Sequence, residues 1–216
     1  MVTKKKILGE KEYTDYLRRL FGKPDDSSMA VSRGVTFQIT GDCTLRCSYC
    51  YEHHKSCGAM TLETGRKIVD YILNLYEDGT GSFINKSTKG IVLDFIGGEP
   101  LLEAELIEHI CDYFFAECWR RKIPIAPFSR ISFATNGQLW FTPEAQHLFK
   151  KYHDMMSVTV SIDGVKELHD ACRVDKNGIG SFESAYKAFQ DGKKYGWYGS
   201  KMTFVPGSFK YIADSI

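Results

Sequence analysis

The sequence lacks the features that would place the protein in a membrane, outside the cell or on nucleic acid. No apolar run approaches the roughly 20 residues that a membrane span needs. The amino terminus begins with basic residues but has neither the apolar core nor the small-residue cleavage site of a secretory signal. Neither sign of charge prevails, because 28 Lys and Arg oppose 27 Asp and Glu for a net charge of +1. We therefore expect a cytoplasmic protein with neither a membrane nor nucleic acid as a partner.

The cysteines do not form the even, dispersed set of a disulfide framework. The chain has seven of them. Four lie in one short stretch, namely Cys43, Cys47, Cys50 and Cys57. The other three are Cys111 and Cys118, which the helical pattern places in the core, and the isolated Cys172. In a chain without a secretory signal, a tight cysteine cluster indicates metal or redox chemistry in a reducing compartment.

Strands and helices alternate after a polar lead and linker over residues 1–33, in which one helix is expected over 13–21. Apolar runs predict strands over residues 35–40, 90–96, 130–135, 157–162 and 201–205. Apolar residues at helical spacing predict helices over residues 61–77, 103–121, 142–152 and 181–195. Thr142 and Ser181 are the expected N-caps of the last two helices.

This alternation predicts an α/β fold over residues 34–216, with parallel strands joined by right-handed crossovers. Because several strands are continuous apolar runs, we expect both faces of the sheet to be covered. An open doubly wound sheet and a partial barrel both fit five strands and four helices. In either architecture the chemistry lies at the carboxyl ends of the strands.

The loop after the first strand carries a C-x3-C-x2-C run at Cys43, Cys47 and Cys50. Three thiolates from one short loop can hold three irons of a [4Fe–4S] cluster and leave the fourth iron without a protein ligand. Catalytic metal sites keep such an open position. Cys57 as a fourth ligand would instead close the site, for zinc or for an electron-transfer cluster, and the spacing leaves that alternative open.

Four segments that follow the strands resemble the motifs of one family. They are the cysteine loop with Tyr49 in its aromatic position, Gly97-Gly98-Glu99-Pro100, Thr135-Asn136-Gly137, and Ser161-Ile162-Asp163-Gly164 followed by His169-Asp170 and Arg173. Together they resemble the radical S-adenosylmethionine (radical SAM) enzymes. The last segment is typical of the peptide- and protein-modifying branch, which includes anaerobic sulfatase-maturating enzymes and ribosomal-peptide maturases. The resemblance covers residues 35–216 and implies a partial (β/α) barrel with about five of its six strands present.

The resemblance also implies which residues bind S-adenosylmethionine. The GGEP turn is expected to receive the methionyl ammonium, because glycine lets the backbone approach closely. Arg173, oriented by Asp163, and Ser161 can donate hydrogen bonds to the carboxylate. The candidates for the ribose and adenine contacts are Asn136, Tyr49 and Val205.

The implied activity is that of an oxidoreductase-like enzyme. Ferredoxin or flavodoxin supplies one electron, S-adenosylmethionine is cleaved to a 5′-deoxyadenosyl radical, and the radical removes hydrogen from a peptide or protein substrate. No catalytic side chain is expected beyond the cluster ligands. The alternatives are a non-catalytic iron–sulfur or zinc module closed by Cys57, and a domain that binds a peptide without chemistry.

Members of this branch usually continue into a sixth strand and a cysteine-rich carboxyl-terminal domain. The present sequence has no cysteine after Cys172 and ends just past the fifth strand. We therefore expect an incomplete radical SAM core, with an inactive fragment as a further alternative.

Other polar residues near the motifs have weaker assignments. Arg46 and Glu52 flank the cluster ligands and are expected to be solvated. His53 and His54 are expected at the surface. Asp94, on the second strand, is a further carboxylate to test.

Overall fold

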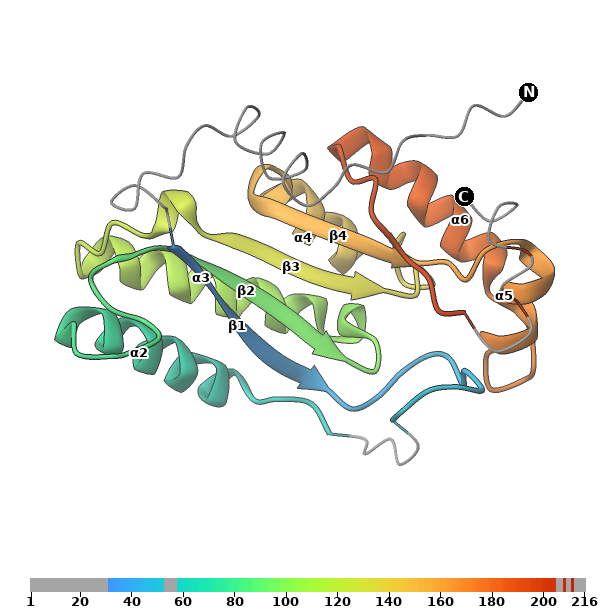
Figure 1. Cartoon of the computed structure of the whole chain (residues 1–216), viewed down its shortest axis with the longest axis horizontal. Coiled ribbons are helices and arrows are strands. Elements are labelled where there is room, and N and C mark those ends of the chain that lie inside the picture. The colour runs from blue at the N-terminus through green and yellow to red at the C-terminus, as the bar shows by residue number, and fades with distance from the viewer. Residues whose placement is uncertain (1–30, 53–57, 205–207, 209–210, 212–216) are drawn as a thin grey trace, which may run out of the picture. The chain divides into compact units, whose positions relative to one another are not determined.

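The computed structural model describes residues 31–52, 58–204, 208 and 211 of the chain, which form an α/β fold around one sheet (Figure 1). The strands are β1 (Val31–Thr40), β2 (Thr88–Gly97), β3 (Arg130–Thr135), β4 (Met156–Ser161) and β5 (Ser200–Lys201). They lie in the order β1-β2-β3-β4-β5, and the pairs from β2 to β5 are parallel. The carboxyl ends of the strands therefore meet at one edge of the sheet.

Side-chain caps mark the start of two of the described helices. The helices are α2 (Leu62–Asp78), α3 (Ala104–Arg120), α4 (Pro143–Tyr152), α5 (Lys166–Cys172) and α6 (Phe182–Gly192), with short 3-10 turns η1 (Pro100–Glu103), η2 (Ala126–Phe128), η3 (His153–Met155) and η4 (Lys193–Tyr195). The Thr61 hydroxyl accepts a hydrogen bond from a backbone N–H in the first turn of α2, and the Thr142 hydroxyl does the same for α4. Gly79 ends α2 with a left-handed φ of 69°.

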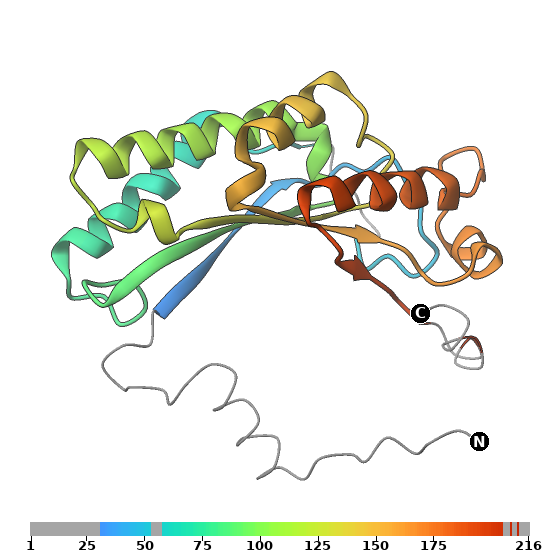
Figure 2. The same ribbon diagram turned by 90° about the horizontal axis from the view of Figure 1, so that it is seen from above.

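Helices cover only one face of the sheet in the described part of the chain. Because the strand order follows the chain order, successive right-handed crossovers place their helices on the same side. Figure 2 shows α2, α3, α4 and α6 together on that side. A doubly wound sheet would need a reversal of strand order, so the architecture is that of a partial barrel.

Burial along the strands confirms this one-sided arrangement. In β3, Ile131 and Phe133 face the helices and are buried, whereas Ser132 and Ala134 are only half-buried. The expectation that both faces are covered is therefore wrong for the described residues. In β2 the uncovered face carries Val92 and Asp94, which are half-buried, and Ile96, which is exposed, so a nearly continuous apolar run does not require two covered faces.

The apolar core lies between the sheet and its helices. Phe37 of β1 and Phe95 of β2 stack with ring centroids 5.1 Å apart. Phe149 of α4 packs against Trp140 at 4.5 Å and Trp197 at 5.3 Å. The expected core residues Cys111 and Cys118 are also buried there, which confirms their assignment.

Three local predictions were wrong or incomplete. The fifth strand ends at Lys201 instead of residue 205, because the Thr203 N–H donates to the Asp163 carboxylate (2.9 Å) and leaves the sheet ladder. Ser181 precedes α6 but makes no side-chain cap to it. Helix α5, which has seven residues, was not predicted.

The expected helix over 13–21 lies outside the described residues. Across the part of the chain that the structure describes, we find no helix with the length and apolar character of a membrane span.

Candidate functional site

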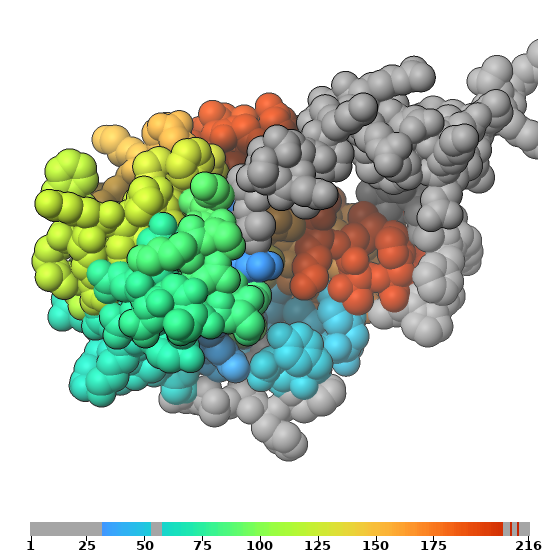
Figure 3. Space-filling view, turned by 60° about the vertical axis from the view of Figure 1, so that its left-hand side comes forward, coloured from blue at the N-terminus to red at the C-terminus, as the bar shows by residue number. Residues whose placement is uncertain are grey.

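A cavity of about 330 Å³ lies at the carboxyl ends of the strands, where the sequence motifs meet. Its size is within the range of small-molecule sites. The lining side chains and backbone come from Cys43, Leu45, Cys47, Tyr49, Cys50, Tyr51, Glu52, Gly97, Gly98, Glu99, Ala134, Thr135, Asn136, Ser161, Arg173, Lys201 and Thr203. Figure 3 shows the cysteine loop, in cyan, on the face that also carries the red segment around β5.

The cysteine loop is held against the segment that follows α5. The backbone N–H of Arg46 donates to the Val174 carbonyl (2.7 Å), and that of Ser48 donates to the Cys172 carbonyl (2.9 Å). Leu45, which precedes these contacts in the loop, is fully buried. The loop therefore has a fixed path, which presents its cysteines to one cavity.

All three predicted cluster cysteines line this cavity, are half-buried and form no disulfide. In the described residues, no three His, Cys, Asp or Glu side chains are arranged to hold a single metal ion. A cubane cluster does not require such an arrangement, because each cysteine binds a different iron. Cys57, the fourth ligand of the closed-site alternative, lies outside the described residues.

The two glycines of the GGEP turn are required by chain packing. A Cβ on Gly97 would lie 2.2 Å from the Thr40 carbonyl oxygen, and one on Gly98 would lie 2.1 Å from the Asp42 carbonyl oxygen. The Gly98 N–H donates to the Thr40 carbonyl (3.1 Å). The glycines therefore dock the end of β2 against the cysteine loop, a reason different from the ligand approach inferred from sequence.

Glu99 joins the ends of two strands. Its buried carboxylate accepts hydrogen bonds from the Thr135 hydroxyl (2.6 Å), the Asn136 N–H (2.7 Å) and the Leu101 N–H (3.1 Å). Burial raises the pKa of Glu99, and these donors act in the opposite direction. The next residue, Pro100, is buried at the start of η1.

Asn136 faces the cysteine loop. Its side-chain amide donates to the Thr44 hydroxyl (3.0 Å) and lies 3.7 Å from the Cys43 sulfur. A donor beside a ligand sulfur is one of the means by which proteins tune cluster potentials. Its position on the cavity wall leaves the predicted ribose contact a hypothesis.

Tyr49, Asp163 and Arg173 meet at a second wall of the cavity. The Tyr49 hydroxyl donates to the Asp163 carboxylate and accepts from the Arg173 guanidinium at 2.7 Å. Burial is the main reason that the pKa of Tyr49 lies above its usual range, and the bond to Asp163 adds to it. Burial acts to lower the pKa of Arg173. The negative charge of the Cys47 thiolate and the interactions with Tyr49 and Asp163 outweigh burial, so the pKa is raised overall.

His169 supports this wall from behind. Its fully buried ring accepts a hydrogen bond from the Asp163 N–H at Nδ1 (3.2 Å) and lies 2.9 Å from the Ser181 hydroxyl at Nε2. That hydroxyl donates to the Arg173 carbonyl (2.8 Å), so the imidazole is the donor to it. Burial, and then the charge of Arg173, lower the pKa of His169 to about 4, so the ring is neutral.

The donor set of the cavity fits S-adenosylmethionine. The Arg173 side chain is only 11% exposed, and its Nε is buried without a hydrogen-bond partner. A carboxylate is the acceptor that such a guanidinium binds best. Ser161 lines the same cavity, and Glu99 and the backbone of Gly97 and Gly98, which also line it, carry acceptors suited to an ammonium.

The structure brings most predicted residues together but not all. Asp94 lies on the open face of β2, where its carboxylate accepts from the Thr36 hydroxyl (3.3 Å), and it does not line the cavity. The exposed Arg46 donates to the carbonyls of its own loop. Val205, His53 and His54 lie outside the described residues.

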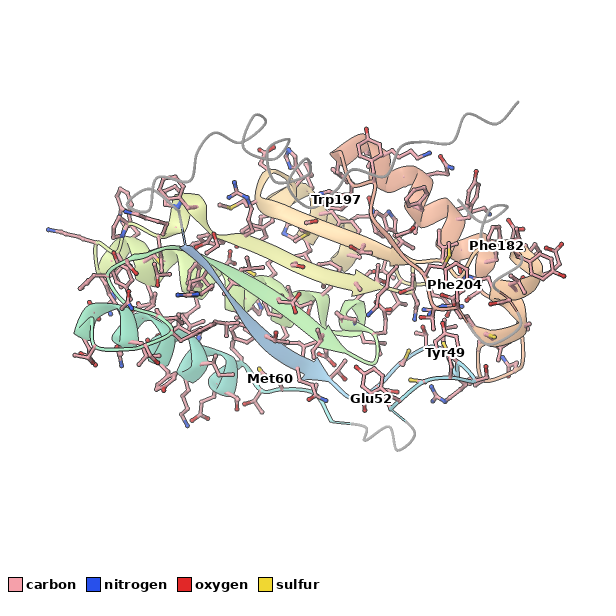
Figure 4. The ribbon with its side chains drawn as sticks, viewed as in Figure 1. Tyr49, Glu52, Met60, Phe182, Trp197 and Phe204 are labelled. Atoms are coloured by element: carbon pink, nitrogen blue, oxygen red, sulfur yellow. The ribbon has the colours of Figure 1, made fainter. Side chains whose placement is uncertain are left out.

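Glu52, which was expected to be solvated, lies in a different environment. It is half-buried and lines the cavity instead of lying free in solvent. Figure 4 shows Glu52 and Tyr49 near the carboxyl ends of the strands. Lys201 and Thr203 also line the cavity and were not predicted. Their spacing of two residues, as in a strand, was the signal that could have found them.

The comparisons with known proteins agree with this geometry. The model of the Radical SAM superfamily matches residues 37–209. The chain belongs to the radical SAM superfamily. It is 32% identical over 166 residues to an uncharacterized protein of Methanocaldococcus jannaschii, covering 74% of this chain and 49% of that protein. It is 30% identical over 161 residues to the cysteine-type anaerobic sulfatase-maturating enzyme of Clostridium perfringens, covering 71% of this chain and 38% of that enzyme.

A solved structure shows the same fold. Native anSMEcpe with bound AdoMet and Cp18Cys peptide superposes with a TM-score of 0.63 at 24% identity, over 85% of this chain and 46% of that one. The predicted radical SAM fold is thereby confirmed, and radical SAM proteins use a [4Fe–4S] cluster and S-adenosylmethionine. This radical SAM chain spans about half the length, or less, of the curated relatives described above.

Proposed function

We propose that this chain is the core of a radical SAM enzyme that acts on a peptide or protein. Cys43, Cys47 and Cys50 would hold the [4Fe–4S] cluster, and the cavity beside them would hold S-adenosylmethionine. When bound, this pair supplies reductive cleavage of the sulfonium to a 5′-deoxyadenosyl radical that removes a hydrogen atom from the substrate.

One observation carries the proposal. The three cysteines line the same cavity as the GGEP turn, Asn136, Ser161 and the incompletely paired Arg173. These groups come from four different parts of the chain and meet where the parallel strands end. Their convergence at the carboxyl edge of a parallel sheet is typical of a binding site.

The residues of the chain bind and orient; none is required to transfer a proton. Arg173 and Ser161 would bind the carboxylate of S-adenosylmethionine through charge-assisted hydrogen bonds. Glu99 fixes the ends of β2 and β3, and thereby the backbone carbonyls around Gly98, which would accept hydrogen bonds from the ammonium. The remaining wall residues, including Leu45, exclude water from the reactive bond.

A peptide or protein is the proposed substrate, and ferredoxin or flavodoxin the proposed electron donor. The substrate proposal is supported by the name of the Clostridium perfringens relative and by the Cp18Cys peptide bound in the solved structure described above. The open face of the sheet, with small or polar residues such as Ser132 and Thr159, can accommodate an extended chain. The electron donor proposal is supported by the family membership alone.

The test is anaerobic reconstitution of the chain with iron and sulfide, followed by dithionite and S-adenosylmethionine. We expect methionine and 5′-deoxyadenosine to be released in equal amounts. Cys50→Ala should abolish the release, whereas Cys118→Ala, in the core at the far end of α3, should leave it unchanged. A chain that holds about four irons but releases no 5′-deoxyadenosine would contradict the proposal.

A second variant separates the open cluster from a closed metal site. Cys57→Ala should leave the iron content unchanged if the cluster has three protein ligands. A marked loss of iron would instead support the non-catalytic module closed by Cys57. The peptide proposal is tested by adding a short cysteine-containing peptide, which should increase 5′-deoxyadenosine release above the level with free cysteine.

A further inference from the structure

The guanidinium of Arg173, the residue that follows α5, has few polar partners in the cavity. It has one described hydrogen bond, from Nη1 to the Tyr49 hydroxyl at 2.7 Å. The nearest carboxylate oxygen, Oδ2 of Asp163, is 3.8 Å from Nη1, which is too long for a direct hydrogen bond. The orientation of Arg173 in the cavity therefore depends on Tyr49.

The Tyr49 hydroxyl lies between the two charged groups. It has one proton, which it donates to Asp163, so its oxygen is free to accept from Arg173. The bond joins residues 114 positions apart in the sequence and connects the cysteine loop to the segment after β4. An aromatic ring at this position satisfies the family motif without a hydroxyl, so the motif does not explain the bond.

Two further hydrogen bonds hold Asp163 in place. Its second carboxylate oxygen accepts from the Thr203 N–H (2.9 Å), and its own N–H donates to His169 (3.2 Å). His169 is linked through Ser181 to the backbone carbonyl of Arg173. The acceptor that Tyr49 uses is therefore rigid, and it can hold the hydroxyl in one place.

We infer that the Tyr49 hydroxyl is a positioning group, which holds the Arg173 guanidinium in the orientation that binds the carboxylate of S-adenosylmethionine. The inference rests on the proposed function and adds a specific task for an oxygen atom on the cluster loop. Because Tyr49 lies between Cys47 and Cys50, the same bond couples carboxylate binding to the path of the cluster loop. The hydroxyl acts through Arg173 and needs no contact with the reacting atoms.

The experiment compares two ligands on two proteins, using the anaerobically reconstituted full chain. The dissociation constants of S-adenosylmethionine and of decarboxylated S-adenosylmethionine are measured for the wild type and for Tyr49→Phe. We expect Tyr49→Phe to weaken binding of S-adenosylmethionine about tenfold, because hydrogen bonds to charged groups are among the stronger ones. Binding of the decarboxylated analogue should change less than twofold.

Matched controls separate positioning from folding. Tyr71→Phe removes the hydroxyl of an exposed tyrosine on α2 and should alter neither dissociation constant. Iron content should stay the same in Tyr49→Phe and in the wild type. Asp163→Asn, which removes the charge and leaves one acceptor oxygen for the two donors of Tyr49 and Thr203, should also discriminate between the two ligands.

The outcomes distinguish this inference from the function on which it rests. An equal loss of affinity for both ligands in Tyr49→Phe would show a general structural role and overturn the inference. No loss for either ligand would overturn it as well. If the iron-loaded wild type fails to bind S-adenosylmethionine, the proposed function itself is wrong, and so is the inference that rests on it.

Discussion

The helix-covered face of the sheet and its carboxyl edge are built from the same strands but are stabilised by different interactions. On the covered face, most contacts are between apolar side chains, such as the packing of Phe149 against Trp140, whose indole N–H donates to the Asp191 carboxylate (2.8 Å). At the carboxyl edge, buried polar groups such as Glu99, His169 and Asp163 are joined by hydrogen bonds. The first region depends on volume and the second on satisfied donors and acceptors.

This difference indicates which substitutions each region tolerates. A core made of apolar contacts accepts a similar volume with little loss, because dispersion and burial are not directional. A buried polar network is damaged by the loss of a single partner, because the group left behind stays desolvated and unpaired. Stability should therefore respond mainly to the covered face, and ligand binding mainly to the carboxyl edge.

The largest effect on stability is expected from Phe149→Ala in α4. Removing this fully buried ring should lower the free energy of unfolding by about 3–5 kcal/mol, since it leaves a cavity beside Trp140 and Trp197. Denaturant unfolding measures the change, and Phe149→Leu should lose much less. If the folded Phe149→Ala protein also bound S-adenosylmethionine far more weakly, the division between the two regions would fail.

Glu99→Gln should show the opposite pattern. An amide at this position directs N–H groups at the donors of Thr135 or Asn136, which leaves at least one buried donor unpaired. We expect a loss of about 1–3 kcal/mol in unfolding free energy, together with a loss of S-adenosylmethionine binding. Glu105→Gln, at an exposed position of α3, is the control. Unaltered ligand binding in Glu99→Gln would separate Glu99 from the site.

Lowering the pH should reduce the free energy of unfolding through protonation of His169. The unfolded chain binds a proton at an ordinary histidine pKa near 6.5, whereas the folded chain binds it only near pH 4. The unfolded state thus holds more protons between these values, and stability falls as the pH is lowered from about 6.5 to about 4, by at most about 3 kcal/mol. His169→Gln should remove this part of the pH dependence. An identical pH profile in the variant would show that His169 titrates normally.

The smallest effect is expected from the exposed ion pair of Lys67 and Glu63 on α2. The two side chains are 74% and 77% exposed, with an N–O distance of 2.6 Å. Lys67→Ala should change the unfolding free energy by no more than about 0.5 kcal/mol, and high salt should remove that difference. A loss comparable to that of Glu99→Gln would mean that this surface charge pair matters as much to stability as the buried polar groups of the carboxyl edge.

Sequence patterns predicted the parts of the fold that are encoded locally. The strand Arg130–Thr135 was predicted at its observed bounds, and Thr142 before Pro143 marked the start of α4, because capping and apolar periodicity act within a few residues. The seven-residue helix α5 was missed, since two turns are too short to show a periodic pattern. The length of β5 depends on the Asp163 side chain, which no local pattern reveals.

The sequence predicted most residues of the site but not the hydrogen bonds between them. Motif spacing brought the cysteines, the GGEP turn and Arg173 to one edge, because parallel strands end together. The bond between Tyr49 and Asp163, and those of Glu99 to Thr135 and Asn136, join distant segments and needed the structure. Glu52 was expected in solvent because its contact with the cavity depends on the path of the whole loop.

The most direct test of the account is the paramagnetic resonance spectrum of the reduced, reconstituted chain, recorded with and without S-adenosylmethionine. A cluster with three cysteine ligands has one iron open to the ligand, so the account predicts about four irons per chain and a signal that changes on addition of S-adenosylmethionine. Cys43→Ala, Cys47→Ala and Cys50→Ala should each lose the signal. A spectrum that S-adenosylmethionine leaves unchanged would contradict the claim that the cavity beside these three cysteines is its binding site.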